Sequence, residues 1–183
     1  MSHFLILIGY RATGKTTLAR LLGERLHLEA VDTDHFVERK AGRTVAEIFA
    51  EQGEPAFRDY ESQAIAELLC GEPCVVATGG GLPVRAANRK FLKRAGRVVW
   101  LKASPETIFR RMTGDPASER MRPQLTNLPP LAEIAHVLSQ RNAIYRETAD
   151  LEVATDEVAL PELADKIAYW FGLALNCIHP PFT

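Results

Sequence analysis

Residues 9–16, GYRATGKT, have the residue types and the spacing that suit phosphate binding. In the pattern GxxxxGK[ST], the glycines allow a tight backbone wrap whose N–H groups point inward at phosphate oxygens. Lys15 can reach the outer phosphates, and the hydroxyl of Thr16 can ligate Mg²⁺. A glycine-bearing turn with a solvated lysine is the alternative. Because an apolar run precedes the motif and a helical pattern follows it, we expect a nucleoside triphosphate with Mg²⁺, bound by Ala12, Thr13, Gly14, Lys15, Thr16 and Thr17.

Two carboxylates, Asp32 and Asp34, stand at the end of the second expected strand. Ligands of open α/β sheets gather at the carboxyl ends of the strands. There, one carboxylate can position Mg²⁺ through water, and the other can accept a proton from an attacking hydroxyl. The alternative is that Asp34 only caps the following helix. These two residues alone favour neither interpretation.

The stretch ATGGG at 77–81 and the pair Arg58 and Glu61 are candidates for binding a second substrate. Three consecutive glycines leave the backbone bare, so a substrate can approach it closely; a plain flexible turn is the alternative. Arg58 and Glu61 are three residues apart and can touch on one helix face. Glu61 would then hold the guanidinium for bidentate contact with a carboxylate, unless the pair is merely solvated.

Strands and helices alternate along the chain. We expect strands at 3–8, 29–33, 73–78, 97–102 and 151–154. We expect helices at 15–27, 45–69 with an interruption at 53–55, 105–112, 131–148 and 160–175, and an irregular stretch at 113–130. This alternation predicts an α/β protein with a parallel sheet and helices on both faces.

Length, charge and cysteine content exclude several classes of protein. The 183 residues suit a single domain spanning 1–183. The net charge is −1 and no apolar run approaches the roughly 18 residues of a membrane span, so we expect neither a nucleic-acid nor a membrane partner. Cys70, Cys74 and Cys177 fit free thiols in a reducing cytoplasm better than a disulfide framework or a zinc site.

The phosphate loop does not identify the acceptor, but missing motifs narrow the choice. Neither DxxG nor NKxD occurs in the chain, so a regulatory GTPase is disfavoured. A motor or transporter ATPase would be longer. A small-molecule or nucleotide kinase fits the length.

Taken together, the motifs resemble those of the shikimate kinase family. The matching segments are GYRATGKTT at 9–17, DTD at 32–34, FRDYE at 57–61, ATGGG at 77–81, MRPQLT at 121–126 and QRNAIYRETA at 140–149. The RPxLT form is most similar to the second bacterial isoform. The resemblance implies a P-loop NTPase fold of three α/β/α layers, like the nucleoside monophosphate kinases, with a five-stranded parallel sheet in the order 2-3-1-4-5 and a mobile lid at about 113–126.

The resemblance also implies a reaction and a set of roles. The γ-phosphoryl group of ATP would pass to the 3-hydroxyl of shikimate, a step of aromatic amino acid biosynthesis, and helices at about 34–61 would bind the shikimate. Asp34 would bind the ring hydroxyls and act as the base. Arg58 and Arg141 would bind the carboxylate of shikimate, and the backbone of Gly79, Gly80 and Gly81 would contact the substrate. Lys15 and the lid residue Arg122 would neutralise the developing charge. Thr16, and Asp32 through water, would hold Mg²⁺, and Arg111 would stack on adenine.

The sequence departs from the family pattern at Ala12, where glycine is usual. Alanine there requires either a negative φ or some backbone strain. Two alternative functions are considered. One is another small-molecule kinase, acting on gluconate or a nucleoside monophosphate. The other is a nucleotide-binding regulator without catalysis, which Ala12 would indicate. From the family, we expect a monomer.

Overall fold

The protein is built on five parallel strands in the order β2-β3-β1-β4-β5, which confirms the predicted fold class and strand order. The computed structural model describes residues 4–114 and 128–176, so most of the predicted lid, Arg122 included, lies outside the described residues, as does Cys177. The strands are β1 (Phe4–Ile8), β2 (Glu29–Asp32), β3 (Cys74–Ala77), β4 (Gly96–Lys102) and β5 (Leu151–Ala154). The first strand is central, with Leu5 opposite Val75 on one side and Arg97 on the other.

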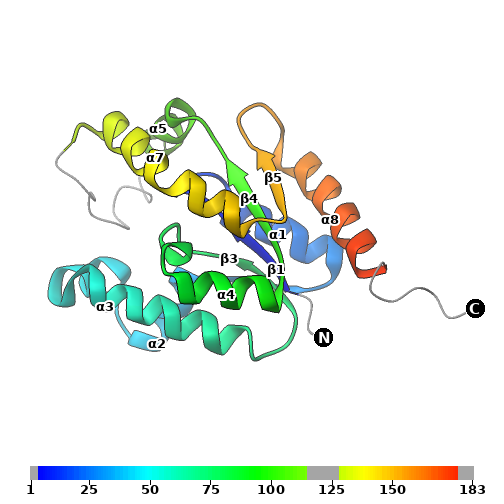
Figure 1. Ribbon diagram of the computed structural model, residues 1–183, viewed down its shortest axis with the longest axis horizontal. Coiled ribbons are helices and arrows are strands. Elements are labelled where there is room, and N and C mark those ends of the chain that lie inside the picture. Colours follow the sequence, from blue (N-terminus) through cyan, green and yellow to red (C-terminus); the bar gives the residue numbers. More distant parts are fainter. Residues whose placement is uncertain (1–3, 115–127, 177–183) are drawn as a thin grey trace, which may run out of the picture.

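Helices pack on both faces of this sheet (Figure 1). The helices of the described residues are α1 (Lys15–Leu26), α2 (Thr33–Ala41), α3 (Val45–Leu68), α4 (Ala86–Ala95), α5 (Pro105–Thr113), α7 (Pro130–Thr148), α8 (Leu160–Asn176) and the 3₁₀ turn η1 (Leu82–Val84). Successive side chains of β1 point to opposite faces of the sheet. Leu5 and Leu7 share a buried cluster with α1 and α8, whereas Phe4, Ile6 and Ile8 share one with α3, α4 and α7. Since β1 is covered on both faces, all five of its residues are apolar and buried.

The boundary between β2 and α2 differs from the sequence prediction, and α4 was not predicted. Thr33 begins α2 instead of ending β2, because Asp32 acts as the N-cap residue. The α4 helix escaped prediction although it is strongly amphipathic. Its N-cap position is Arg85, which makes no side-chain capping bond, so the usual start signal is missing.

The long helix α3 begins and bends where the sequence predicts. Thr44 and Glu47 form a reciprocal capping box at its start. Gly53 interrupts the helical backbone with φ 81° and ψ 173°, and Pro55 follows. The bend separates a first helical segment from a second one that carries Arg58 and Glu61.

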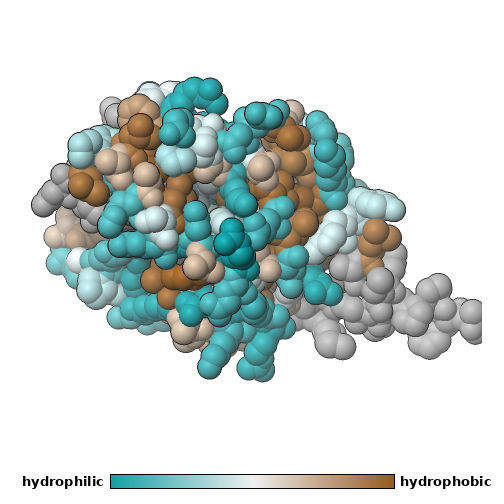
Figure 2. Space-filling view, turned by 45° about the horizontal axis from the view of Figure 1, so that its top comes forward, coloured by the Kyte–Doolittle hydropathy of each residue, from teal (hydrophilic) through white to brown (hydrophobic). Residues whose placement is uncertain are grey.

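On the face that Figure 2 shows, hydrophilic residues cover much of the described surface, and apolar residues show between them. Within residues 4–114 and 128–176, no helix combines the length and the apolar character needed to cross a membrane.

Candidate functional site

The turn between β1 and α1 encloses the side chain of Lys15. Lys15 is buried, and its Nζ donates to the carbonyl of Tyr10 at 2.6 Å. The hydroxyl of Thr13 donates to the same carbonyl at 2.8 Å, while Thr17 is exposed. The N-cap residue is Gly14, which has no side chain to cap the start of α1, and the start of a helix attracts anions. The arrangement can hold phosphate, as the motif predicts.

Two residues of the phosphate loop, Tyr10 and Arg11, tie it to α5 and α7. The Tyr10 side chain lies in a buried cluster with Ile108 of α5 and Ile134 of α7. The guanidinium of Arg11 donates to Oε1 of Glu133 at 3.2 Å, and the Glu133 side chain is only 1% exposed. These contacts join residues far apart in the chain, so no local motif in the sequence predicts them.

Ala12 adopts the left-handed conformation, with φ 60°. Of the two possibilities that the sequence left open, a negative φ or backbone strain, the structure shows backbone strain. Arg111 supports it: its Nη1 donates to the Ala12 carbonyl at 3.3 Å and to the Thr155 hydroxyl at 3.0 Å. Its other amino group donates to the Thr155 carbonyl. Arg111, the residue predicted to contact adenine, therefore lies between the phosphate loop and the loop after β5.

The predicted metal residues, Thr16 and Asp32, contact one another directly. The Thr16 hydroxyl donates to Oδ2 of Asp32 at 2.6 Å, and Oδ1 of Asp32 accepts from the backbone N–H of Asp34 at 2.9 Å. The helix cap is therefore Asp32, and the alternative role considered for Asp34 is wrong. A cavity of about 70 Å³ opens here, lined by Thr16, Asp32, His35 and Arg20 among others.

These oxygen donors fit Mg²⁺. Mg²⁺ prefers hard oxygen ligands, retains several waters and usually takes only one or two carboxylates, with substrate phosphates completing its shell. The site described here has one hydroxyl and one carboxylate. Clusters of three or more His, Cys, Asp or Glu residues that could hold a metal are absent from the described residues.

The three glycines after β3 are all buried, and two of them lie where a side chain has little or no room. A Cβ atom on Gly80 would stand 3.1 Å from the carbonyl oxygen of Gly9 in the phosphate loop. A Cβ atom on Gly81 would stand 2.0 Å from Nη1 of Arg58. Gly79 donates its N–H to the buried Thr33 hydroxyl at 2.8 Å. The glycines therefore join three parts of the site: the phosphate loop, α2 and Arg58.

Arg58 is held by two carboxylates, and one of these is fully buried. Its Nη1 donates to Glu61 at 2.6 Å, and its Nε donates to Glu54 at 3.1 Å. The side chains of Arg58 and Glu61 are 12% and 0% exposed. Burial opposes the charge on Arg58, but the attraction and hydrogen bonds of Glu61 and Glu54 outweigh it, so the pKa of Arg58 is raised. The interpretation as a merely solvated pair is wrong, because Glu61 is inaccessible to water.

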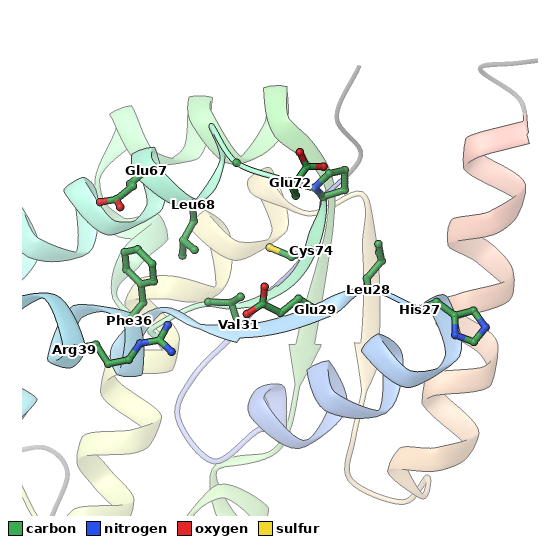
Figure 3. Close-up of a pocket in the computed structure, with 12 residues that line it drawn as sticks. His27, Leu28, Glu29, Val31, Phe36, Arg39, Glu67, Leu68, Glu72 and Cys74 are labelled. Carbon is green, nitrogen blue, oxygen red and sulfur yellow. The ribbon is translucent and has the colours of Figure 1, made fainter.

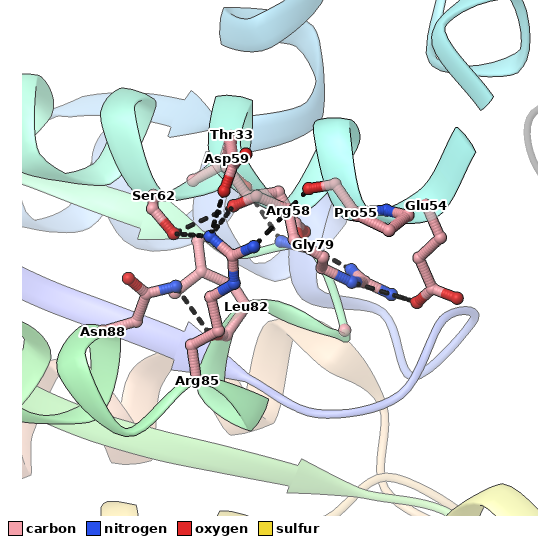
Figure 4. A network of polar contacts seen from close by, with 12 residues as sticks. Thr33, Glu54, Pro55, Arg58, Asp59, Ser62, Gly79, Leu82, Arg85 and Asn88 are labelled. Carbon is pink, nitrogen blue, oxygen red and sulfur yellow. Dashed lines mark hydrogen bonds and ion pairs between the residues drawn. The ribbon is translucent and has the colours of Figure 1, made fainter. Parts of the chain in front are cut away.

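A second arginine, Arg85, joins the glycine segment to α3 (Figure 4). Its guanidinium donates to the Arg58 carbonyl at 3.1 Å, to Asp59 at 2.7 Å and to Ser62 at 3.2 Å. Arg85 therefore fixes the backbone of the residue whose side chain is predicted to bind the acceptor. No sequence motif pointed to it.

Two residues of α7 reach the carbonyl of Gly80. The hydroxyl of Tyr145 donates to it at 2.6 Å, and Nη1 of Arg141 donates to it at 3.4 Å. The structure thus places the predicted residues of α1, α2, α3, α7 and the glycine segment around the carboxyl ends of β1, β2 and β3. Tyr145 lies within the segment QRNAIYRETA, but only its contact with Gly80 reveals a role.

A separate cavity of about 420 Å³ lies near the amino ends of β2 and β3 (Figure 3). Its lining includes Glu29, Phe36, Arg39, Leu68 and Cys74, and none of the predicted site residues. Burial, assisted by Glu29, raises the pKa of the Cys74 thiol to about 11. Cys70 and Cys74 are both free thiols, as the sequence predicts.

Comparison with known proteins identifies relatives of the whole chain. The sequence profile of the family described as shikimate kinase matches residues 11–171. A shikimate kinase of Symbiobacterium thermophilum is 40% identical over 163 residues, which are 89% of this chain and 92% of that protein. A shikimate kinase of Pseudomonas putida is 44% identical over 84% of this chain and 87% of its own length. The structure of shikimate kinase from Acinetobacter baumannii in complex with shikimate superposes with a TM-score of 0.85 at 35% identity, covering 100% of this chain and 97% of that one.

Substitution of Ala12 tests the left-handed turn of the phosphate loop. In Ala12→Gly, relief of about 1–2 kcal/mol of strain is offset by lost methyl packing and by a more flexible unfolded chain, so we expect a change in unfolding free energy below about 1 kcal/mol. In Ala12→Val, a β-branched residue is forced to positive φ, and we expect nucleotide affinity to fall at least about tenfold. Urea unfolding and calorimetric titration with ADP measure the two effects.

His27→Val is the matched control, because within residues 4–114 and 128–176 His27 is the other non-glycine residue with positive φ, and it caps the far end of α1. It should lose stability and keep its affinity for ADP. Unchanged ADP affinity in Ala12→Val would contradict the assignment of strain at the phosphate loop.

Proposed function

The chain belongs to the shikimate kinase family, and from that premise we propose how its own residues divide the work of the reaction. The activity is that of the family: an ATP-dependent transfer of a phosphoryl group to a hydroxyl of shikimate. Such a transfer needs little covalent help from the protein. It depends on positioning the two reactants and on stabilising negative charge.

We propose that the turn at residues 9–14 and the start of α1 bind the triphosphate of ATP. The N–H groups at the start of α1 and the ammonium of Lys15, which donates to the Tyr10 carbonyl of the same turn, would supply the positive charge. Arg111, already bonded to the Ala12 carbonyl, would line the nucleotide side. Arg122 is proposed to add a further positive charge from the lid.

Mg²⁺ would be held by the Thr16 hydroxyl and, through water, by Asp32. When bound, Mg²⁺ neutralises phosphate charge. The protein's own contribution is to hold these two oxygens in position: Asp32 is fixed by the Thr16 hydroxyl on one side and by the start of α2 on the other.

Shikimate would lie on the side of the glycine segment that faces away from the phosphate loop. Its carboxylate suits the guanidinium groups of Arg58 and Arg141, and its hydroxyls suit Asp34 and the backbone of Gly79–Gly81. The N–H groups of Gly80 and Gly81 donate no hydrogen bond among the described residues, and they supply two donors to an acceptor placed there. Asp34, two residues from Asp32, is proposed to accept the proton of the attacking hydroxyl.

One observation supports this division most strongly: the contact of Gly80 with the phosphate loop. In this contact, the glycine segment and the adjacent guanidinium of Arg58 lie against the loop proposed to bind the triphosphate. The proposed phosphate site and the proposed carboxylate site would thus meet with only backbone between them. In a non-catalytic regulator, nothing would require this contact.

Release of ADP from Mg·ATP tests the function. Shikimate should stimulate it strongly, and quinate, gluconate and AMP should not. Stimulation by gluconate or AMP would favour another small-molecule kinase. ATP binding without stimulation by any acceptor would favour the regulator.

Replacement of Asp34 by asparagine tests the proposed base. The change keeps the size of the side chain but removes its capacity to take a proton, so we expect kcat to fall by about 10²–10⁴-fold. The dissociation constant for ADP should stay within about twofold, measured by calorimetry. Turnover near that of the unmodified protein would show that another group takes the proton.

Replacement of Gly81 by alanine tests the room that Arg58 requires. The new methyl group would overlap Nη1 of Arg58, so the guanidinium must leave Glu61 while the backbone stays in place. We expect the KM for shikimate to rise at least about tenfold, since a charged hydrogen bond is worth roughly 1.5–3 kcal/mol, and the KM for ATP to change little. Gly172→Ala is the control, because a Cβ there meets no atom within 4 Å. An equal rise in both KM values would contradict the placement.

A further inference from the structure

The peptide group between Gly80 and Gly81 is held from one side by a buried tyrosine of α7. Tyr145 is completely buried, and its hydroxyl donates to the Gly80 carbonyl at 2.6 Å. Arg141, one helical turn earlier, donates to the same oxygen at the longer distance of 3.4 Å. The tyrosine therefore makes the shorter of the two bonds, and the arginine shares its acceptor.

The direction of this carbonyl also determines the direction of an N–H group. A trans peptide is planar, so the carbonyl of Gly80 and the N–H of Gly81 point to opposite sides, and the described chain contains no cis peptide bond. With the carbonyl turned toward α7, the Gly81 N–H is turned away from α7. This N–H makes no hydrogen bond within the described residues although Gly81 is buried, as an N–H reserved for a ligand would be.

The glycine segment cannot set this direction alone. Glycine accepts many backbone conformations, so a peptide between two glycines rotates at little cost unless something holds it. Tyr145 is a rigid holder, because its ring lies in the core beside Trp100, with the ring centres 5.7 Å apart. The core thus determines where the hydroxyl points, and the hydroxyl determines the orientation of the peptide.

We propose that Tyr145 is a positioning residue for the acceptor substrate. By holding the Gly80 carbonyl, it presents the Gly81 N–H to shikimate and leaves the second guanidinium nitrogen of Arg141 for the substrate's carboxylate. The proposal rests on the function proposed above. It assigns Tyr145 no contact with either substrate.

Tyr145→Phe tests the proposal, because it removes only the hydroxyl. We expect the KM for shikimate to rise roughly threefold to tenfold, the range for one lost neutral hydrogen bond, and the KM for ATP to change less than about twofold. Glycine-selective ¹⁵N labelling adds a direct readout. The Gly81 amide resonance should shift on addition of shikimate to the unmodified protein, and its shift should be smaller in Tyr145→Phe.

Thr148→Val is the matched control for lost stability. Thr148 is buried on the same helix, and its hydroxyl donates to the Ile144 carbonyl at 2.6 Å, away from Gly80. It should lower the urea midpoint and leave both KM values unchanged. If Tyr145→Phe leaves the KM for shikimate unchanged, or raises it no more than Thr148→Val does, the proposal is wrong. Absence of shikimate-stimulated ADP release from the unmodified protein would instead refute the proposed function.

Discussion

The site depends on the packing of one backbone segment against another. Gly80 lies against the carbonyl of Gly9, so the segment after β3 and the loop after β1 meet without a side chain between them. The parallel pairing of β1 with β3 brings both strand ends to the same edge, and the missing side chain lets them touch. Two reactants must come within a few ångströms for a phosphoryl group to pass between them. The distance between the proposed ATP and shikimate sites would therefore be set by backbone, which is the least adjustable part of the protein.

Charges around this contact are held before any substrate arrives. Arg58 lies between Glu54 and the buried Glu61, and Arg11 lies against the nearly inaccessible Glu133. Such pairs add little net stability, because removing charges from water costs about as much as their attraction returns. Their value here is orientation: a guanidinium already fixed in direction loses less entropy when it binds an anion. The protein thus meets the cost of ordering these side chains during folding.

The sequence predicted the local features and missed the distant ones. The phosphate loop, the capping box at Thr44 and the pair of Arg58 with Glu61 each lie within a few residues, so spacing alone reveals them. The contact of Tyr145 with Gly80 joins residues in different elements, and no local spacing encodes it. The capping role went to Asp32 rather than Asp34, because the start of a helix depends on backbone angles that composition does not determine.

The central position of β1 has a consequence for biosynthesis. The strand that leads into the phosphate loop pairs with β3 through Leu5 and Val75, and with β4 through Ile8 and Trp100. A ribosome therefore releases the loop's whole sequence long before the partners that shape it exist. Pairing over such separations costs loop-closure entropy and slows folding. Until Trp100 has been synthesised, the nascent chain carries the phosphate-binding motif without the complete sheet that positions it. During this time the apolar residues of β1 are exposed, and exposed apolar segments of this kind are the ones that chaperones protect from aggregation.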